Sequence, residues 1–242
     1  MEFTFGIITN NGNYIETIIK SIIDLNVKNY EIIVVGKLNR NIENIKYIEY
    51  LDDLENFSIS TKKNIITDNS KFENIVYLHD YISFDKDWYK GFLYFGNDFD
   101  VCMTKILNKD GSRYRDWCLW QDDAKKIVSN GNYLIPYNIK NLSNMMYISG
   151  SYWVAKKKFM VENRLNEKLK WNQGEDVEWS LRVRNKTHFK INTNSFVNLL
   201  KQKDRIFNET SSQENFKLSK MDSYDNRNSY NELIKNHIGK WL

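Results

Sequence analysis

The opening of the chain constrains the fold more than any other stretch. Residues 3–9 form a short apolar run that ends in polar residues, which is typical of a buried strand followed by a turn. Isoleucines within 15–23 recur with the spacing of one helix face, and a second apolar run occupies 30–35 before Gly36. A strand, a helix and a strand in so short a stretch predict a right-handed βαβ unit and therefore a parallel sheet.

Polar residues follow each of the predicted strands. A third strand is expected at 46–51 and a fourth at 74–78, with a helix at 60–70 between them. Open parallel sheets bind ligands beyond the carboxyl ends of their strands. Any one of these polar segments could also be ordinary turn chemistry, and neither a GxGxxG nor a GxxxxGKS/T sequence marks a nucleotide site. We expect a binding rim formed by four segments: Thr9-Asn10-Asn11, Gly36-Lys37, Asp52-Asp53 and His79-Asp80-Tyr81.

Composition limits the class of protein. With 242 residues, 41% of them hydrophobic, the chain can bury a substantial core and is too apolar for a disordered protein. The net charge of +4 is mild and the basic residues are scattered, so nucleic-acid binding is not indicated, whereas a groove for a phosphate-bearing ligand fits. No apolar run approaches the ~18 residues that cross a membrane. The N-terminus lacks the layout of a secretion signal, and Cys102 and Cys118 suggest no disulfide framework, so we expect a cytoplasmic protein.

The second half of the sequence is less regular. Residues 107–146 show no clear periodicity, and a segment of this kind within a compact domain is typical of a functional loop or lid. We expect one α/β domain at 1–203 and a C-terminal helical extension at 204–242 packed on the same domain. We expect a helix at 85–96 and a strand at 100–106, followed by the irregular segment at 107–146. A further strand is expected at 147–155 and two weak strands at 189–200.

The stretch Gly174-Glu175-Asp176 is the strongest candidate for a chemical role. The glycine permits a sharp turn, and apolar residues at Val177, Leu181 and Val183 indicate a helix that begins directly after it. Acids in a first helical turn are favoured by the helix dipole, so helix capping is one interpretation. The other is a general base, that is, a carboxylate held at a turn-to-helix junction and aimed into a cleft. The spacing alone leaves both interpretations open.

The order of these features resembles the GT-A fold glycosyltransferases, specifically the large family 2 group, over about residues 3–203. The resemblance implies a Rossmann-like, mostly parallel central sheet flanked by helices. It also implies transfer of a sugar from a nucleotide-sugar, UDP-linked, to a hydroxyl of a glycan or glycoconjugate acceptor, with inversion. It is carried by the segments Phe5-Gly6-Ile7-Ile8-Thr9-Asn10-Asn11, Ser60-Thr61-Lys62-Lys63-Asn64, Asn74-Ile75-Val76-Tyr77-Leu78-His79-Asp80-Tyr81, Asp85-Lys86-Asp87-Trp88 and Gly174-Glu175-Asp176.

The resemblance assigns roles to individual residues. Asp176 would be the base that deprotonates the acceptor hydroxyl, and Glu175 would hold the acceptor sugar or brace the loop. Thr9 and Asn11 would bind the donor, and Lys63 would lie near the uracil or the diphosphate. A carboxylate in this role is chemically reasonable, because a sugar hydroxyl is a poor nucleophile at neutral pH.

The metal-binding signature of the family is altered at His79-Asp80-Tyr81. The last aspartate of that signature, which ligates a divalent ion in the family, coincides with Tyr81, and a phenol of pKa about 10 is a poor ligand for Mg²⁺ or Mn²⁺. Asp80 and His79 remain as candidate metal ligands, with His79 better suited to Mn²⁺. Near the place of a late family histidine the sequence offers Lys201 and Lys203. We therefore expect a weak or absent metal requirement, with a lysine neutralising the leaving diphosphate.

Candidate acceptor residues are Trp171, Trp153 and Arg113. Sugar C–H faces stack on indole rings, which favours the two tryptophans, while the segment around Arg113 fits either an acceptor lid or a solvated loop with local ion pairs. Three alternative functions stay open: a retaining transferase of the same fold, a non-catalytic GT-A domain that binds a glycan or nucleotide within an assembly, and, with the least support, a nucleic-acid-binding protein.

Overall fold

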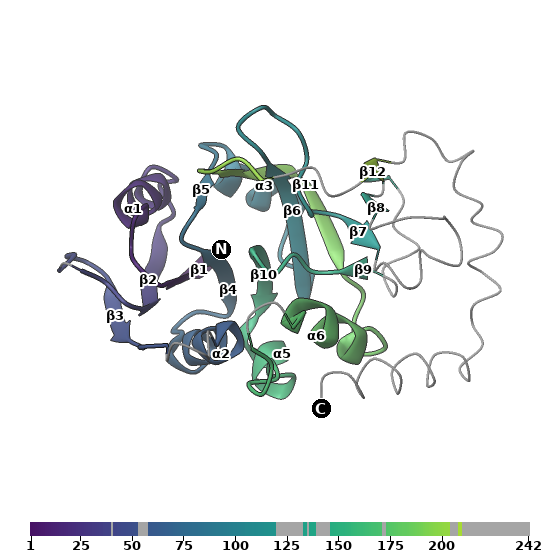
Figure 1. The fold of residues 1–242 in the computed structure, drawn as a ribbon. Helices are drawn as coiled ribbons and strands as arrows, with labels where there is room; N and C mark the ends of the chain where they lie inside the picture. The colour runs from purple at the N-terminus through teal and green to yellow at the C-terminus, as the bar shows by residue number, and fades with distance from the viewer. Residues whose placement is uncertain are drawn as a thin grey trace.

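The computed structural model describes residues 1–39, 41–52, 58–119, 133–134, 136–138, 146–170, 173–203 and 208–209. Its centre is an eight-stranded sheet, shown in Figure 1. The strands of this sheet are β1 (Glu2–Thr9), β2 (Asn29–Gly36), β3 (Lys46–Glu49), β4 (Asn74–His79), β5 (Ile82–Phe84), β6 (Val101–Leu107), β10 (Tyr152–Lys156) and β11 (Lys190–Leu199). They follow one another across the sheet in the order β3-β2-β1-β4-β10-β6-β11-β5.

The N-terminal half of the sheet is parallel, as the opening βαβ pattern predicts. β1 pairs in parallel with β2 and with β4, and β2 pairs in parallel with β3. Consequently Thr9 and His79, at the carboxyl ends of β1 and β4, lie at the same edge of the sheet. The remaining strands make the sheet mixed, because β10 runs antiparallel to both β4 and β6, and β11 pairs in parallel with β6 and antiparallel with β5.

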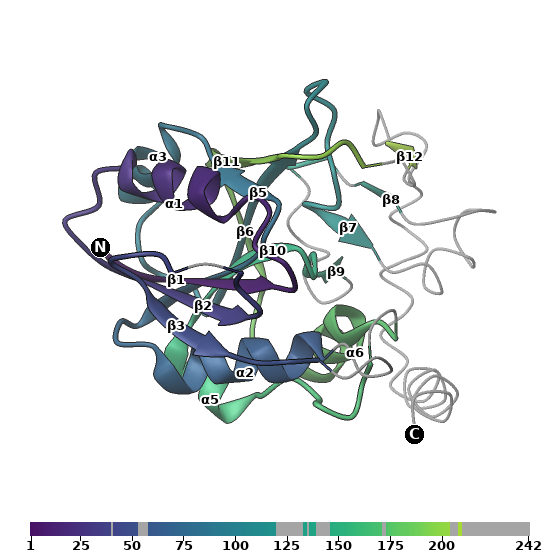
Figure 2. The same cartoon turned by 60° about the vertical axis from the view of Figure 1, so that its left-hand side comes forward.

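Helices cover both faces of the sheet. α1 (Ile15–Ile23) and α3 (Trp88–Phe95) lie on one face, whereas α2 (Ile59–Asn69), α5 (Lys157–Glu162) and α6 (Glu175–Val183) lie on the other, as Figures 1 and 2 show from two directions. Each face has its own core: Ile18 of α1 and Trp88 of α3 belong to one buried cluster, and Ile66 of α2 and Trp179 of α6 to the other. Burying one such side chain stabilises the fold by roughly 1.5–3 kcal/mol.

A second, small sheet lies beside α6. It consists of the two-residue strands β7 (Cys118–Leu119), β8 (Tyr133–Leu134), β9 (Met146–Tyr147) and β12 (Asn208–Glu209), in the order β12-β8-β7-β9. Cys118, Leu134 and Tyr147 pack on Val177 of α6. Of the predicted helical extension, Asn208 and Glu209 form β12 instead of a helix, and the rest lies outside the described residues.

Most predicted elements of the main sheet are present, with two differences. The strand expected at 147–155 is interrupted, so that β9 and β10 are separated by residues 148–151. The two weak strands expected at 189–200 are one strand, β11, whose register shifts between Asn192 and Phe196. None of the helices in the described part of the chain is long and apolar enough to cross a membrane.

Candidate functional site

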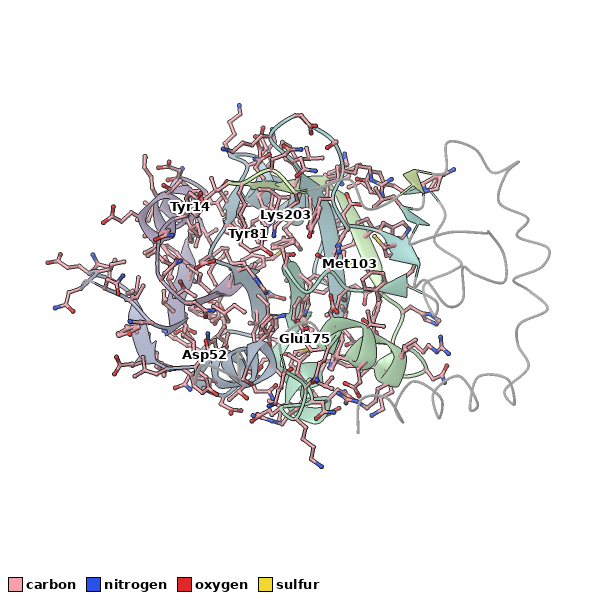
Figure 3. All side chains as sticks on the ribbon, viewed as in Figure 1. Tyr14, Asp52, Tyr81, Met103, Glu175 and Lys203 are labelled. Atoms are coloured by element: carbon pink, nitrogen blue, oxygen red, sulfur yellow. The ribbon has the colours of Figure 1, made fainter. Side chains whose placement is uncertain are left out.

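A cavity of about 350 Å³ lies at the carboxyl ends of β1 and β4, where the sequence predicts a binding rim. Figure 3 labels three residues that line it, Tyr14, Tyr81 and Lys203, and shows the last two side by side. With the exception of Lys63, the cavity gathers every residue that the sequence assigns to donor binding: Thr9, Asn11, His79, Asp80, Tyr81, Lys201 and Lys203. Asn10, which belongs to the predicted rim, also lines the cavity, whereas sequence reasoning gave no role to the other polar lining residues, Asn13, Tyr14 and Lys62.

Thr9 fixes the orientation of Asp80. Its Oγ1 donates a hydrogen bond of 2.6 Å to Asp80 Oδ2. The same Oγ1 accepts the backbone N–H of Gly12 at 2.8 Å, and Gly12 has a φ of +68°, which glycine adopts without strain. The turn after β1 therefore holds Thr9, and Thr9 holds the carboxylate of Asp80 at the rim of the cavity.

Tyr81 is a buried phenol beside two ammonium groups. Its hydroxyl donates to Ser151 Oγ at 3.2 Å, and burial raises its pKa well above the usual value. Lys201 Nζ and Lys203 Nζ lie 4.3 Å and 4.7 Å from the centre of its ring. The phenol is protonated at neutral pH, so Tyr81 offers no anionic oxygen to a metal ion.

His79 is held as a neutral imidazole. Burial lowers its pKa well below the usual range, and the positive charges of Lys63 and Lys203 lower it further. Its backbone N–H donates to Ser151 O at 3.0 Å, while its buried Nε2 has no hydrogen-bond partner among the described residues. His79 therefore contributes shape and one unpaired ring nitrogen to the site, but no charge.

Lys63, which the resemblance places near the donor, is not among the residues that line the cavity. Its side chain is fully buried, and its Nζ donates to Gly150 O at 2.8 Å and contacts Glu175 Oε1 at 3.3 Å. The neighbouring residue, Lys62, reaches the cavity instead and forms an ion pair of 2.5 Å with Asp52. Successive residues of a helix point about 100° apart. Lys62 therefore points toward the cavity, whereas Lys63, the next residue of α2, points toward Gly150 and Glu175.

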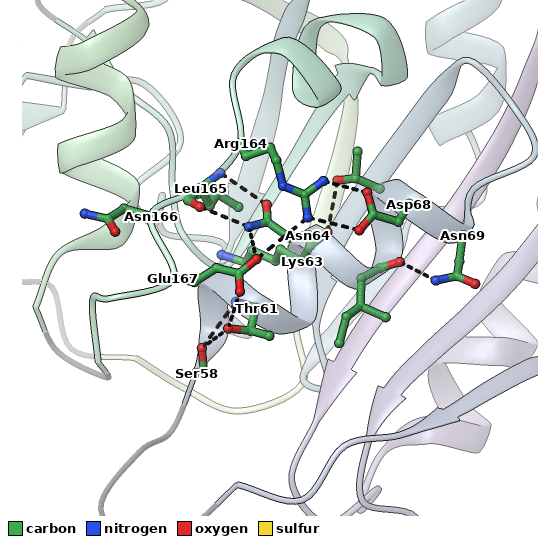
Figure 4. Close-up of polar contacts among 12 residues, drawn as sticks. Ser58, Thr61, Lys63, Asn64, Asp68, Asn69, Arg164, Leu165, Asn166 and Glu167 are labelled. Atoms are coloured by element: carbon green, nitrogen blue, oxygen red, sulfur yellow. Dashed lines mark hydrogen bonds and ion pairs between the residues drawn. The ribbon is translucent and has the colours of Figure 1, made fainter.

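Residues of α2 also hold the segment that leads to Gly174. Figure 4 shows Asn64 bonded to both backbone groups of Leu165, with its Nδ2 3.0 Å from the carbonyl oxygen and its Oδ1 3.1 Å from the nitrogen. Asn64 Nδ2 also donates to Glu167 Oε1 at 2.7 Å, and Arg164 forms an ion pair of 2.6 Å with Asp68. Because these contacts fix residues 164–167 on α2, the approach to α6 is anchored next to Lys63.

Asp176 stands at the start of α6, where both sequence interpretations placed it. The preceding Gly174 adopts a left-handed conformation with φ 71°, and α6 begins at Glu175. Asp176 Oδ2 accepts the backbone N–H of Gly150 at 2.8 Å, and Oδ1 accepts that of Val177 at 2.9 Å. Burial and then the charge of Glu175 raise the pKa of the Asp176 carboxyl to about 6, against the opposing effects of Lys63 and these hydrogen bonds. The result is a half-buried carboxylate suited to accept a proton near neutral pH.

The segment Ser149-Gly150-Ser151, between β9 and β10, connects the cavity to Asp176. Gly150 bonds to Asp176 through its N–H and to Lys63 through its carbonyl oxygen. Ser151 contacts His79 and Tyr81 on the other side. A side chain at Gly150 would collide with the acids, since a Cβ there would lie 2.8 Å from Asp176 Oδ2. In the sequence, this segment could have been found from its three small residues at 149–151, within the strand predicted at 147–155.

Two predicted acceptor residues have structural roles instead. Trp153 is fully buried and stacks on Tyr77 with 4.7 Å between ring centres, so its ring has no exposed face for a sugar. Arg113 forms an ion pair of 2.7 Å with Asp116, a fully buried acid that also accepts from Tyr137. Arg113 therefore compensates a buried charge, whereas the sequence allowed an acceptor lid or a solvated loop with local ion pairs. The third candidate, Trp171, lies outside the described residues.

The residues that line the cavity do not fit a divalent cation. Asp80 is the acid that lines it, and its Oδ2 already accepts from Thr9. The other candidate oxygen belongs to the protonated phenol of Tyr81, and Lys201 and Lys203 bring positive charge to the same place. Among the described residues, no group of three or more His, Cys, Asp or Glu side chains is arranged to hold a metal ion. Hard dications prefer several oxygen ligands, and the amide oxygens near Asp80 are already engaged: Asn10 Oδ1 accepts from Lys62 and Asn11 Oδ1 accepts from the Asn13 N–H.

The mixed sheet flanked by helices, with its cavity at the carboxyl ends of β1 and β4, has the GT-A fold, the α/β fold expected from the sequence. The structure is similar to S. aureus TarS residues 1–349, with 13% identity over 89% of this chain and a TM-score of 0.52. The same protein in complex with UDP-GlcNAc gives 12% identity over 88% and a TM-score of 0.51. GalNAc-T7 with UDP, GalNAc and Mn²⁺ gives 13% identity over 88% and a TM-score of 0.58.

The similarity covers only part of these proteins. The chain spans 62% and 59% of the two TarS chains and 44% of the GalNAc-T7 chain. No family model and no curated protein sequence matches the chain. At identities of 12–13% the comparisons show a shared fold, and function has to be argued from the residues of the site.

Proposed function

We propose that the protein is a glycosyltransferase that moves a sugar from a nucleotide-sugar, UDP-linked, to a hydroxyl group of a glycan acceptor, with Asp176 as general base. One observation carries the proposal: a lysine-bearing cavity and a carboxylate of raised pKa stand on the two sides of Ser149-Gly150-Ser151. The complexes of TarS with UDP-GlcNAc and of GalNAc-T7 with UDP support a uridine nucleotide as the donor.

The chemistry follows from the two sides of the site. Asp176 removes the proton of the acceptor hydroxyl while the oxygen attacks the anomeric carbon of the donor. The bond between that carbon and the diphosphate breaks, and its electron pair leaves with the diphosphate. With base and leaving group on opposite sides of the sugar, attack comes from the back and inverts the configuration. Glu175, held by Lys63, orients the acceptor side.

A non-catalytic domain that binds a nucleotide or glycan is the second candidate. It is favoured by the misfit between the cavity and a divalent cation, because the family to which the sequence is similar binds one there. The raised pKa of the Asp176 carboxyl, next to Glu175, speaks against this candidate, since strongly perturbed carboxyl groups concentrate at catalytic sites.

Binding and chemistry can be tested separately. A nucleotide-sugar that binds the folded protein raises its melting temperature, so a panel of UDP-, GDP- and CDP-sugars should identify the donor. Incubation with that donor should release the nucleoside diphosphate, and NMR of the transferred sugar should show inverted anomeric configuration. Stabilisation without release of nucleoside diphosphate, in the presence or absence of sugar acceptors, would support the non-catalytic candidate, and retained configuration would exclude Asp176 as the base of a single displacement.

A further inference from the structure

The charges around the cavity are unevenly distributed. Lys62 is compensated by its ion pair of 2.5 Å with Asp52. Lys201 and Lys203 stand at the opposite side, over Tyr81, where Asp80 is the neighbouring acid that lines the cavity. Two ammonium groups therefore stand close together where β4 ends and where the chain leaves β11, and an anionic ligand is attracted to that place.

The segment that carries the two lysines is held in place by hydrogen bonds. Leu200 N donates to Tyr81 O at 2.9 Å, directly next to Lys201. Lys203 N donates to Asn108 Oδ1 at 3.0 Å, and Gln202 Nε2 contacts Asp110 Oδ2 at 3.3 Å. Since both ends of the short segment are fixed, little ordering is needed when a ligand binds between its side chains.

The aromatic ring of Tyr81 contacts the ammonium groups of Lys201 and Lys203. This ring is buried and lines the cavity, and Figure 3 shows Tyr81 next to Lys203. An ammonium group near an aromatic face is attracted by the ring. Two ammonium groups at one ring also repel each other, and an anion that contacts both removes this repulsion. A dication placed at Asp80 would instead add to it.

We propose that Lys201 and Lys203 bind the diphosphate of the donor directly, and that donor binding requires no divalent cation. This inference rests on the proposed transferase function and specifies how its leaving group is stabilised. The two ammonium groups donate hydrogen bonds to oxygens of the diphosphate. When the bond from the anomeric carbon to the diphosphate breaks, the electron pair stays on the diphosphate and both lysines keep their protons, while the acceptor proton goes to Asp176.

Calorimetric titration with UDP tests the inference without any turnover. The full chain is titrated in buffer with EDTA and again with excess Mn²⁺. We expect equal affinity in the two buffers, within about twofold. The double variant Lys201→Ala, Lys203→Ala should bind UDP at least about tenfold more weakly in both, and Lys201→Arg, Lys203→Arg should retain most of the affinity.

A matched double variant controls for the loss of two positive charges. Lys86 and Lys90 are exposed and do not line the cavity, so Lys86→Ala, Lys90→Ala should bind UDP like the unaltered protein. The melting temperature of each variant reports whether it is folded.

Binding of UDP only in the presence of Mn²⁺ overturns the inference and leaves the transferase function standing. Metal-free binding that survives the loss of Lys201 and Lys203 overturns the assignment of these lysines. Absence of UDP binding in both buffers, with no other nucleotide-sugar of the thermal panel bound, overturns the proposed function and the inference together.

Discussion

Lys62 and Lys63 are adjacent on α2, yet their ammonium groups belong to opposite halves of the site. Lys62 Nζ donates to Thr9 O at 3.2 Å and is paired with Asp52, beside the cavity. Lys63 Nζ donates to Gly150 O at 2.8 Å and is paired with Glu175, beside the candidate base. One helix thus fixes the relative positions of the donor cavity and the carboxylate. A reaction in which acceptor and leaving group lie in line depends on that spacing.

Replacing the candidate base should remove turnover and preserve donor binding. In Asp176→Asn the amide keeps the size of the side chain but cannot accept the acceptor proton, so kcat should fall by about 10²–10⁴-fold. The affinity for UDP should stay within about twofold, because Asp176 does not line the cavity. Steady-state kinetics and calorimetry measure the two quantities. Asp87→Asn, an exposed acid on the other face of the sheet, serves as control, and an Asp176→Asn variant with normal kcat would remove Asp176 from this role.

The rate should fall as the pH drops through about 6. Burial and Glu175 raise the pKa of Asp176 to about 6, so below that pH a growing fraction of the base is protonated and inactive. The acidic limb of kcat/KM should therefore report the pKa of the Asp176 carboxyl in the free enzyme. Removing the positive charge of Lys63 should shift this limb to higher pH, because that charge lowers the Asp176 pKa. A profile that is flat from about pH 5 to about pH 8 would contradict the assignment.

The edge of the sheet where the cavity lies could be predicted from the sequence. β1 and β4 are short, apolar and separated by helix-length segments, so their parallel pairing follows from general rules of chain connection. Parallel pairing places the ends of both strands together, and Thr9 therefore meets Asp80 although 71 positions separate them. No detail of side-chain packing is needed for this inference.

The direction of individual side chains could not be predicted in the same way. On α2, the polar residues Lys62, Lys63 and Asn64 are all buried, so no polar face marks which side of the helix meets the sheet. Without that rotational phase, the sequence does not show that Lys62 lines the cavity and that Lys63 does not. Trp153 presents a similar difficulty, because whether an indole faces a core or a ligand depends on neighbours from distant strands, here Tyr77 of β4.

The buried ion pair of Lys63 and Glu175 should matter for stability. Lys63→Met removes one partner and leaves Glu175 as an uncompensated charge that is 7% exposed, which should cost about 3–5 kcal/mol of unfolding free energy. Adding Glu175→Gln removes the orphaned charge and should recover part of the loss. Lys20→Met is the matched control, since Lys20 and Asp24 form an exposed ion pair whose loss should cost less than about 1 kcal/mol. Denaturation in urea measures all three; equal losses for Lys63→Met and Lys20→Met would show that the buried pair contributes nothing specific.

A methyl group at Gly150 should disturb the base while sparing the donor cavity. The Cβ of Gly150→Ala would lie 2.8 Å from Asp176 Oδ2 and 3.0 Å from Glu175 Oε1, closer than ordinary contacts allow. Either the segment or the two carboxyl groups have to move, and a displacement of the base by about 1 Å can cost about 10²-fold in rate. We therefore expect a large loss of kcat with little change in the dissociation constant for UDP.

Ser149→Ala separates this effect from a general sensitivity of the segment. Ser149 is buried next to Gly150, but its Oγ has no hydrogen-bond partner among the described residues. Removing that hydroxyl loses no hydrogen bond within the described structure, so kcat and the melting temperature should stay near those of the unaltered protein. If Ser149→Ala lowers kcat as much as Gly150→Ala does, the segment acts through its overall packing, and the contact between Gly150 and Asp176 is not the reason for its small residues.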